Sequence, residues 1–441
     1  MTSVMRNLIL ALPMAAILAA CGNAPIVLSE EEKAARVTVN PFSENLVPDA
    51  TLAASTITLP AAQPSGDWLQ SGSNASKVPG HLVAGEQFKV DWRVSAGEGS
   101  GELKRIVAAP VAKAGRIYTI DSNQVVTAFD TASGKRVWEN KLKASNPKWD
   151  EYTVGGGLAI AGEKLIVASG FAYIAALNLS DGTEIWHRRV ETPLSSSPAI
   201  LGNRAFLTST NNDFYAVNTD TGEVIWNDQA LSESARVLSS PSPAVNQDIL
   251  AVGYSSGELI AYLPANGRRL WTDTLTSTGR YTPLSAINDI AGKPTIQDGV
   301  VYVASHSGIL TAIDARSGTR IWSKTFGSRQ GPVIGGDLLY VVGTNSKVAA
   351  INKIDGKVAW VRELPEFRDN NVENRIVWTG PLLASNRVVI ASSEGDVIAL
   401  SPQNGETLAD IKLGQPVYIE PIAANGKIFV LTDQAQLVAI K

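Results

Sequence analysis

The sequence predicts an all-β fold: an eight-bladed β-propeller of four-stranded antiparallel blades, with the last blade closed by an N-terminal strand. Three observations lead to this fold class. One short unit recurs along most of the chain, the residues before each copy have the pattern of further strands, and the two chain ends carry complementary parts of one unit. Successive copies lie about 38 to 51 residues apart, which is the range of a four-stranded blade.

The recurring unit has an alanine, a glycine six residues later and a tryptophan four residues after that. A seventh copy, starting at Ala399, carries Ala409 in place of the tryptophan, and Ala439 starts an eighth copy two residues before the C-terminus. The six complete copies start at Ala128, Ala176, Ala216, Ala261, Ala312 and Ala350.

Each part of the unit predicts a local structure. In the copy at 310–322, alternating residues predict a strand, Asp314 and Gly318 predict a turn, and a second strand ends on Trp322. Residues 294–304, just upstream, read as strand, tight turn and strand. One unit is therefore four antiparallel strands. It cannot bury both faces alone, so the units must stack in a row or in a ring.

The chain ends favour the ring. The eighth unit makes three strands and stops at Lys441, while residues 88–94 form a lone strand that carries the unassigned Trp92. If that strand completes the last blade, the circle closes and removes the exposed edges of an open array. The alternative is an open solenoid, but neither end carries the polar capping repeat that such arrays need.

The N-terminal region has a different character. Residues 1–20 combine Arg6 with an apolar run that is too short to span a bilayer, which predicts a signal peptide. The run ends in Leu-Ala-Ala-Cys, and Cys21 is the only cysteine of the chain, so neither an internal disulfide nor a cysteine metal cluster is predicted. The prolines and small polar residues of 21–66 predict a flexible tether, and the propeller is assigned to 67–441.

Four connections between units are long, and each joins the last strand of one blade to the first strand of the next. All four should therefore emerge on one face, where a rigid scaffold usually carries its binding residues. Some of their apolar residues would instead seal the ring. The connections are 141–157, 231–243, 272–294 and 362–381, with Trp149, Tyr152, Tyr281, Leu284, Phe367, Arg368 and Trp378 as their prominent side chains.

The sequence predicts no catalytic residues, no metal site and no cofactor. Residues 253–257 match Gly-x-Ser-x-Gly, but they lie at a hairpin tip rather than at the strand-to-helix turn which that motif requires. His81, His187 and His306 have no ligand spacing. The net charge of −4 is spread along the chain, without the basic stripe of a nucleic-acid binder. One repeat position carries turn-forming residues rather than calcium ligands: Asp130, Asn178, Asn218, Asp314 and Asn352.

The repeated Ala-apolar-Asp/Asn-x-x-x-Gly-x-x-x-Trp unit resembles the pyrroloquinoline-quinone-type propeller repeat. One branch of that superfamily, the quinoprotein alcohol dehydrogenases, implies a redox cofactor and calcium in the central channel. This chain lacks the adjacent cysteine pair that many of them carry. The other branch is the BamB family of lipoproteins from the outer-membrane β-barrel assembly machinery, and resemblance to it covers essentially the whole chain. The Leu-Ala-Ala-Cys box resembles a lipoprotein signal, which implies lipidated Cys21; Gly22 after it implies the outer membrane.

Resemblance to the BamB family implies that the partner is BamA, bound through its periplasmic POTRA domains. The match to the family's contact loops is partial, because the arginine is displaced and Ala291 replaces the second acidic residue. Unfolded outer-membrane proteins, pairing with a blade edge, are a second partner class. A ligand-binding or enzymatic propeller and a lipoprotein with an unrelated binding role remain the alternatives. The matching positions are Arg236, Val237, Leu238, Ile287, Asn288 and Asp289.

Overall fold

The computed structural model describes residues 46–53, 57–143, 155–233, 237, 241–276, 287–370 and 373–441. The chain forms two compact units. The smaller consists of residues 1–37 and Phe367–Arg375, and includes the 3-10 helix η3 (Arg368–Asn370). The larger consists of residues 38–366 and 376–441 and holds all the sheets of the described chain. No helix in these ranges is both long and apolar enough to cross a membrane.

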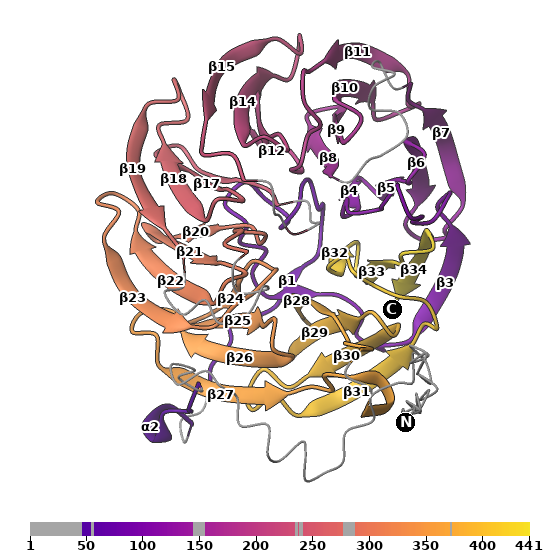
Figure 1. The fold of residues 1–441 in the computed structure, drawn as a ribbon. Coiled ribbons are helices and arrows are strands. Elements are labelled where there is room, and N and C mark those ends of the chain that lie inside the picture. Colours follow the sequence, from indigo (N-terminus) through magenta and orange to yellow (C-terminus); the bar gives the residue numbers. More distant parts are fainter. Residues whose placement is uncertain are drawn as a thin grey trace, which may run out of the picture. The chain divides into compact units, whose positions relative to one another are not determined.

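Within the larger unit the sheets follow one another around a ring in chain order (Figure 1). Five antiparallel blades come from consecutive strands. They are β4 (Val111–Lys113), β5 (Arg116–Ile120), β6 (Val125–Asp130) and β7 (Arg136–Lys141); β8 (Gly156–Ala161), β9 (Lys164–Ser169), β10 (Tyr173–Asn178) and β11 (Glu184–Arg189); β12 (Ala199–Leu201), β13 (Arg204–Thr208), β14 (Asp213–Asn218) and β15 (Val224–Gln229); β16 (Ala244–Val245), β17 (Leu250–Gly253), β18 (Glu258–Tyr262) and β19 (Arg269–Thr274); and β20 (Thr295–Gln297), β21 (Val300–Ala304), β22 (Ile309–Asp314) and β23 (Arg320–Thr325).

Three further sheets complete the ring. One is the blade of β24 (Val333–Gly335), β25 (Leu338–Val342), β26 (Lys347–Asn352) and β27 (Val358–Glu363). The last blade has the order β3 (Val90–Ser95), β34 (Gln436–Ile440), β33 (Lys427–Leu431) and β32 (Ile422–Ala424). Between them lies a six-stranded sheet of β1 (Gln63–Pro64), β2 (Leu82–Val83), β28 (Trp378–Ala384), β29 (Arg387–Ser392), β30 (Asp396–Leu400) and β31 (Thr407–Lys412).

The prediction of eight four-stranded blades is therefore wrong: the structure has seven such blades, not eight. Strands β28 to β31 are joined by β1 and β2: β2 pairs in parallel with β28, and β1 pairs in parallel with β2. Both extra strands come from the region between residues 57 and 85, where two-residue strands leave no alternating pattern in the sequence. The all-β propeller of antiparallel blades is confirmed.

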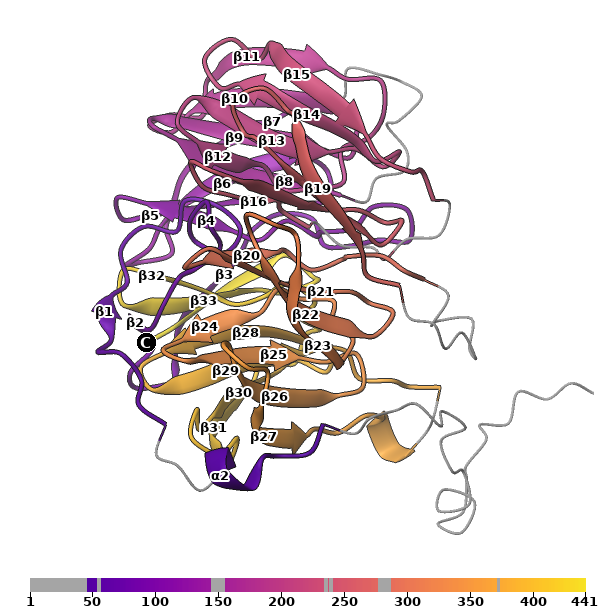
Figure 2. The ribbon, with the colours of Figure 1, turned by 90° about the vertical axis from the view of Figure 1, so that its left-hand side faces the viewer.

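Residues 57–85, which we call the inner strap, run along the inner edges of the sheets. In seven of the sheets the strap gives a hydrogen-bond partner to the inner strand or to the turn that follows it, so these edges do not end on bare hydrogen-bonding groups. Figure 2 shows β1 and β2 together at one face of the ring. The contacts are Trp68 with Ala112 (2.8 Å in both directions), Leu69 with Ile160 (2.7 Å), the Gln70 side chain with Ile200 (2.8 Å), Ala75 with Val245 (2.9 Å), Ser76 with Ile296 (2.9 Å), Leu82 with Ser385 (2.7 Å) and Gly85 with Gly426 (3.0 Å).

Strand burial follows the position of a strand in its blade. The inner strands, such as β8 and β9, are almost wholly buried because neighbouring sheets cover both faces. Outer strands such as β23 bury essentially only the repeat tryptophan. Helix α2 (Ala50–Ala53) precedes the strap, and the Asp49 carboxylate accepts hydrogen bonds from the Thr51 and Leu52 amides at its N-terminus.

The repeat residues lock each blade to the next. Within a blade, the strand register places the repeat alanine directly opposite the repeat tryptophan, as with Ala261 and Trp271. The indole then packs on the glycine of the next blade and its Nε1 donates to a turn carbonyl there: Trp226 packs on Gly267 and donates to Pro264 at 3.2 Å. The other donor–acceptor pairs are Trp92–Thr131, Trp138–Leu179, Trp186–Thr219, Trp271–Ala315, Trp322–Lys353 and Trp360–Pro402.

Ala409 breaks this pattern for a structural reason. The sheet that holds Ala409 is followed by the last blade, in which the third strand, β34, and the fourth strand, β3, are not consecutive in the chain, so no glycine turn joins them. The end of the strap fills that junction: Arg387 donates to the carbonyls of Gly85 and Glu86, both at 2.9 Å, and its guanidinium lies 5.6 Å from the centre of the Phe88 ring. A tryptophan at position 409 would have no turn on which to pack.

The predicted closure of the last blade is confirmed by the pairing of β3 with β34, in which Trp92 lies opposite Ala439. Asp91 fastens the two chain ends, since its carboxylate is 2.7 Å from Lys427 Nζ and 2.6 Å from Lys441 Nζ. Hydrogen bonds from Lys427 and then Lys441 lower the pKa of Asp91 to about 2. The closure is therefore expected to depend on pH.

We expect Asp91→Asn to lower the free energy of unfolding by about 1 kcal/mol at neutral pH, the upper range for a partly exposed ion pair. The folded-state pKa lies below the unfolded value of about 3.9. The stabilisation is thus present above about pH 4 and is lost as the pH falls through about 2. Urea denaturation at several pH values checks this, with Asp410→Asn on exposed β31 as the control. A difference between Asp91→Asn and the parent chain that stays constant down to pH 2 would rule the clamp out.

Candidate functional site

The long connections share one face of the ring for a topological reason. In a meander of four antiparallel strands, the connection to the next blade and the turn between the second and third strands lie on the same face. The other two turns lie on the opposite face. Contacts agree with this assignment: the Gly257 turn, between β17 and β18, lies against Asn288 of the connection that leads into β20. We call this side the loop face.

The structure brings together two of the predicted connections. The Val237 amide donates to the Asp289 carboxylate at 2.7 Å, across the gap between the connection before β16 and the one before β20. Val237, Ile287 and Asn288 are half-buried, whereas Asp289 is only 5% exposed. Arg236, Leu238 and Cys21 lie outside the described residues, as do Trp149, Tyr152, Tyr281 and Leu284.

Asp289 thus joins loops within the chain instead of standing free at the surface. Its carbonyl also accepts the His306 amide at 2.8 Å, which ties the connection to the turn after β21. Such a buried carboxylate fixes the positions of its neighbours, because leaving it without partners would be costly. Trp378 is also buried, and its Nε1 donates to the Pro365 carbonyl at 2.9 Å, which fits the sealing role given as the alternative.

Phe367 and Arg368 belong to the smaller unit. There the Arg368 amide donates to the Asn374 carbonyl at 2.9 Å, and the Arg375 guanidinium lies 5.8 Å from the centre of the Phe367 ring. These contacts form a short closed turn within that unit.

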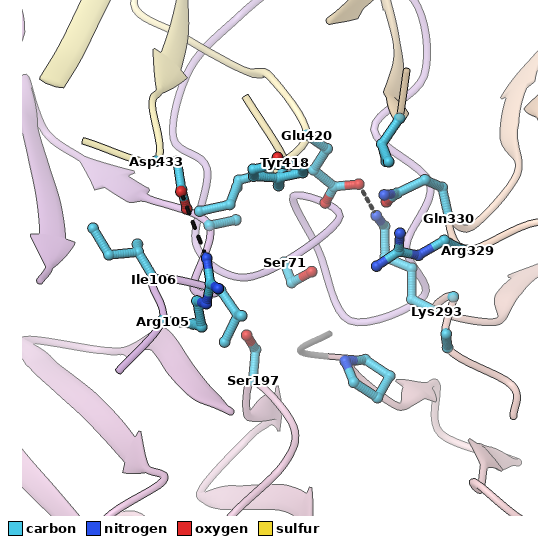
Figure 3. A pocket seen from close by; sticks show the side chains of 17 residues that line it. Ser71, Arg105, Ile106, Ser197, Lys293, Arg329, Gln330, Tyr418, Glu420 and Asp433 are labelled. Carbon is cyan, nitrogen blue, oxygen red and sulfur yellow. Dashed lines mark hydrogen bonds and ion pairs between the residues drawn. The ribbon is translucent and has the colours of Figure 1, made fainter. Parts of the chain in front are cut away.

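A cavity of about 210 Å³ lies at the ring centre, on the side of the loop face. Most of its walls come from segments that immediately precede inner strands. Asp433 comes from a turn between a second and a third strand, the one from β33 to β34. Ser71 of the inner strap lies between the two sides of the cavity (Figure 3). The connections before β16, β20 and β28 contribute Pro241, Lys293 and Val377. Three of the four long connections therefore frame this cavity.

Charged side chains gather in the cavity. Lys293 and Glu420 form an ion pair with side chains only 8% and 11% exposed, and Arg105 lies 4.0 Å from Asp433. Figure 3 shows Arg105 on one side and Arg329 with Lys293 on the other. Burial lowers the pKa of Arg329, an effect offset by Tyr418 and Asp289. The guanidinium nevertheless remains charged at physiological pH.

Lys77 of the inner strap lies next to this cluster. Its side chain is only 1% exposed, and its Nζ donates to Gln70 Oε1 at 3.4 Å. Burial lowers the pKa of Lys77 well below its usual range, and the positive charge of Lys293 adds to this effect while Glu420 opposes it. Burial, followed by the Arg329 charge, also lowers the pKa of His306.

Sequence reasoning missed this cluster, although the repeat contains a signal for it. A proline starts or immediately precedes most inner strands, and the residue before that proline lines the cavity in several repeats. The residue before the proline is small in most copies. It is charged only in two copies, as Lys293 and Glu420, and these two form an ion pair with each other.

The motifs judged to be structural have structural contacts. Ser255, in the Gly-x-Ser-x-Gly match, lies in the turn between β17 and β18 and donates to Asn212 Oδ1 at 3.0 Å in the turn between β13 and β14. His81 Nδ1 lies 2.8 Å from the Pro60 carbonyl, and its Nε2 accepts the Asn386 amide at 2.9 Å. Asp314 accepts the Ser317 amide at 2.7 Å, as expected of a turn former. No cluster of three or more His, Cys, Asp or Glu with metal-binding geometry occurs in the described ranges.

The fold and repeats define a propeller of the quinoprotein-repeat type. The family model for "Outer membrane protein assembly factor BamB" matches residues 80–149, 122–362 and 369–441, and the chain belongs to this family. Two relatives with that name are each 27% identical, over 352 residues in Salmonella typhimurium and 355 in Escherichia coli K12. Both matches cover 79% of this chain and 88% of the relative.

Solved structures support the fold. BamB from Moraxella catarrhalis superposes with a TM-score of 0.65 at 16% identity, covering 79% of this chain and 99% of that one. Quinohemoprotein alcohol dehydrogenase from Comamonas testosteroni gives 0.66 at 15% identity, covering 86% and 81%. At these identities the likeness concerns the fold alone. The family assignment therefore rests on the sequence matches.

Proposed function

We propose that this chain is a non-catalytic scaffold of the outer-membrane protein assembly complex. Its relatives carry the name outer membrane protein assembly factor, which supports a place in that complex and in the cell envelope. The partner is BamA, bound through its POTRA domains on the loop face. Assistance to the insertion of β-barrel proteins follows from this docking.

The hydrogen bond between the Val237 amide and the Asp289 carboxylate is the observation that carries the docking proposal. It holds two of the connections expected to bind the partner at a fixed separation. A preformed pair of loops loses less conformational entropy on binding than two independent ones. In this arrangement Val237 and Leu238 are the apolar anchors, Arg236 pairs with a partner charge, and Asp289 positions the loops.

The anchoring part of the proposal concerns the N-terminus. Residues 1–20 act as a signal peptide that is removed, and Cys21 carries acyl chains such as palmitate that hold the protein on the periplasmic face of the outer membrane. The residues between Cys21 and the inner strap then act as the tether. Mass spectrometry of the mature N-terminus tests this directly, since an unmodified Cys21 would rule it out.

Site-specific photo-crosslinking tests the docking face. A photoreactive residue at Val237 should crosslink in cells to the BamA homologue, whereas the same residue at Ile354 should not. Ile354 is 66% exposed in the turn between β26 and β27, on the opposite face. Exposure therefore cannot explain a crosslink confined to Val237. Crosslinking to BamA at Ile354 but not at Val237 would contradict the proposed face.

A further inference from the structure

The central cavity has the size of a small-molecule site. Its volume of about 210 Å³ is many times the roughly 10–15 Å³ that a cavity needs to hold one water molecule. Ser71 and the neighbouring strap residues lie across the ring centre, and the sheets surround the sides. Such a space suits a small metabolite better than a helix or strand of another protein.

Among the residues that line the cavity, three basic side chains (Arg105, Lys293 and Arg329) face two acidic ones (Glu420 and Asp433), which leaves an excess of one positive charge. Lys293 and Glu420 neutralise each other, and Arg105 has Asp433 at 4.0 Å. Arg329 forms no ion pair with a carboxylate among the described residues. The charge of Asp289 acts on Arg329, but Asp289 does not line the cavity, and its carboxylate accepts the Val237 amide.

Within the part of the chain that the structure describes, the second basic group without a carboxylate partner is Lys77. In the described chain its amine has only the Gln70 oxygen as a hydrogen-bond partner, at the long distance of 3.4 Å. Burial with so little compensation favours the neutral amine, and an anion close by would favour its protonated form. Because Gly72 packs between the side chains of Lys77 and Lys293, an anion that reached Lys293 would also act on Lys77.

The remaining wall selects the kind of anion. Ser71, Gln330 and Tyr418 offer hydrogen-bond donors, and apolar side chains line the wall of the cavity between these polar groups. Arg105 lies on one side of this space and Arg329 on the other (Figure 3). A ligand with an acidic group at each end and a short hydrocarbon middle matches both features. The apolar wall residues are Ile106, Val107, Ala109, Ala291, Val377 and Ile419.

We propose that the central cavity binds a small organic dicarboxylate, with one carboxylate on Arg329 beside Lys293 and the other facing Arg105. The site takes residues from the ends of the two docking connections, such as Pro241 and Lys293, but none of the residues proposed to dock the partner. Binding there does not require the partner, so it can be measured on the isolated full-length protein.

Isothermal titration at constant ionic strength tests the proposal with three probes: succinate, the uncharged succinamide and inorganic phosphate. We expect succinate to bind with a Kd at or below about 1 mM, succinamide not to bind, and phosphate to bind more weakly because it reaches only one side. Succinate binding no better than succinamide would overturn the proposal. Phosphate binding as tightly as succinate would overturn its dicarboxylate character.

Substitutions at and away from the cavity test where succinate binds. Arg329→Gln should weaken succinate binding about tenfold or more, the loss expected for one charge-assisted contact. Arg329→Lys should retain part of the affinity. Arg316→Gln, in the exposed turn between β22 and β23, should leave the affinity unchanged. Undiminished binding to folded Arg329→Gln would overturn the placement. If Arg329→Gln does not fold, the comparison of succinate with succinamide on the parent chain decides the proposal.

Discussion

Replacing Gly267 with alanine should lower the free energy of unfolding by about 2–5 kcal/mol, whereas the same change at Gly299 should cost only about 1–2 kcal/mol. The two glycines have nearly the same φ, +75° and +76°, so the strain of placing a side chain in the left-handed region is common to both. A Cβ on Gly267 would lie 2.7 Å from Cδ2 of Trp226, but on Gly299 it would meet no described atom within 4 Å. The difference between the variants therefore isolates the contact between blades.

Urea denaturation of both variants measures this difference. We expect the Gly267 variant to show the larger loss because the partly buried indole of Trp226 cannot move without giving up its hydrogen bond to Pro264. Equal losses would show that the glycine serves only the turn. The account of how blades lock together would then be wrong.

Much of the ring could be predicted because its contacts repeat. The spacing of alanine, glycine and tryptophan places Ala312 opposite Trp322 and sets the indole of Trp271 on Gly318, so one pattern encodes both the blade and its junction. The strand with Trp92 was recognisable because it lacked a partner in its own part of the sequence.

The count of four-stranded blades failed where the structure stops repeating. The inner strap follows the inner edges of the ring with irregular backbone, and its two strands are two residues long. No hydrophobic period marks such a segment. Only the three-dimensional closure of the ring creates the edges that it covers.

The same limit applies to the site. The sequence placed Val237 and Asp289 on neighbouring loops, but the burial of Asp289 depends on loop conformation, which no periodic pattern specifies. The Lys293–Glu420 pair joins residues far apart in the chain. The charged residues at the repeat position before the proline are a sequence signal for the Lys293–Glu420 pair, but only the closed ring shows that the two side chains meet.

The largest expected effect on function is the loss of docking when Arg236 and Leu238 are both replaced by glutamate. Leu238→Glu places a charge in the apolar centre of the proposed interface, where desolvation without a partner costs several kcal/mol. Arg236→Glu turns an attraction into a repulsion. The combined loss of binding free energy from the two changes is larger than most transient interfaces can tolerate.

A matched control exists on the opposite face. Arg316→Glu with Ile354→Glu makes the same two chemical changes at exposed positions in turns between third and fourth strands. Thermal melts should show both double variants folded, so any difference between them reports on the docking face.

Co-purification from solubilised membranes, with each full-length variant as bait, is the decisive measurement. The account predicts that the BamA homologue is recovered with the parent chain and with the Arg316/Ile354 variant, and is lost from the Arg236/Leu238 variant. Recovery of BamA with a folded Arg236/Leu238 variant, or its loss from the Arg316/Ile354 variant alone, would contradict docking through the loop face.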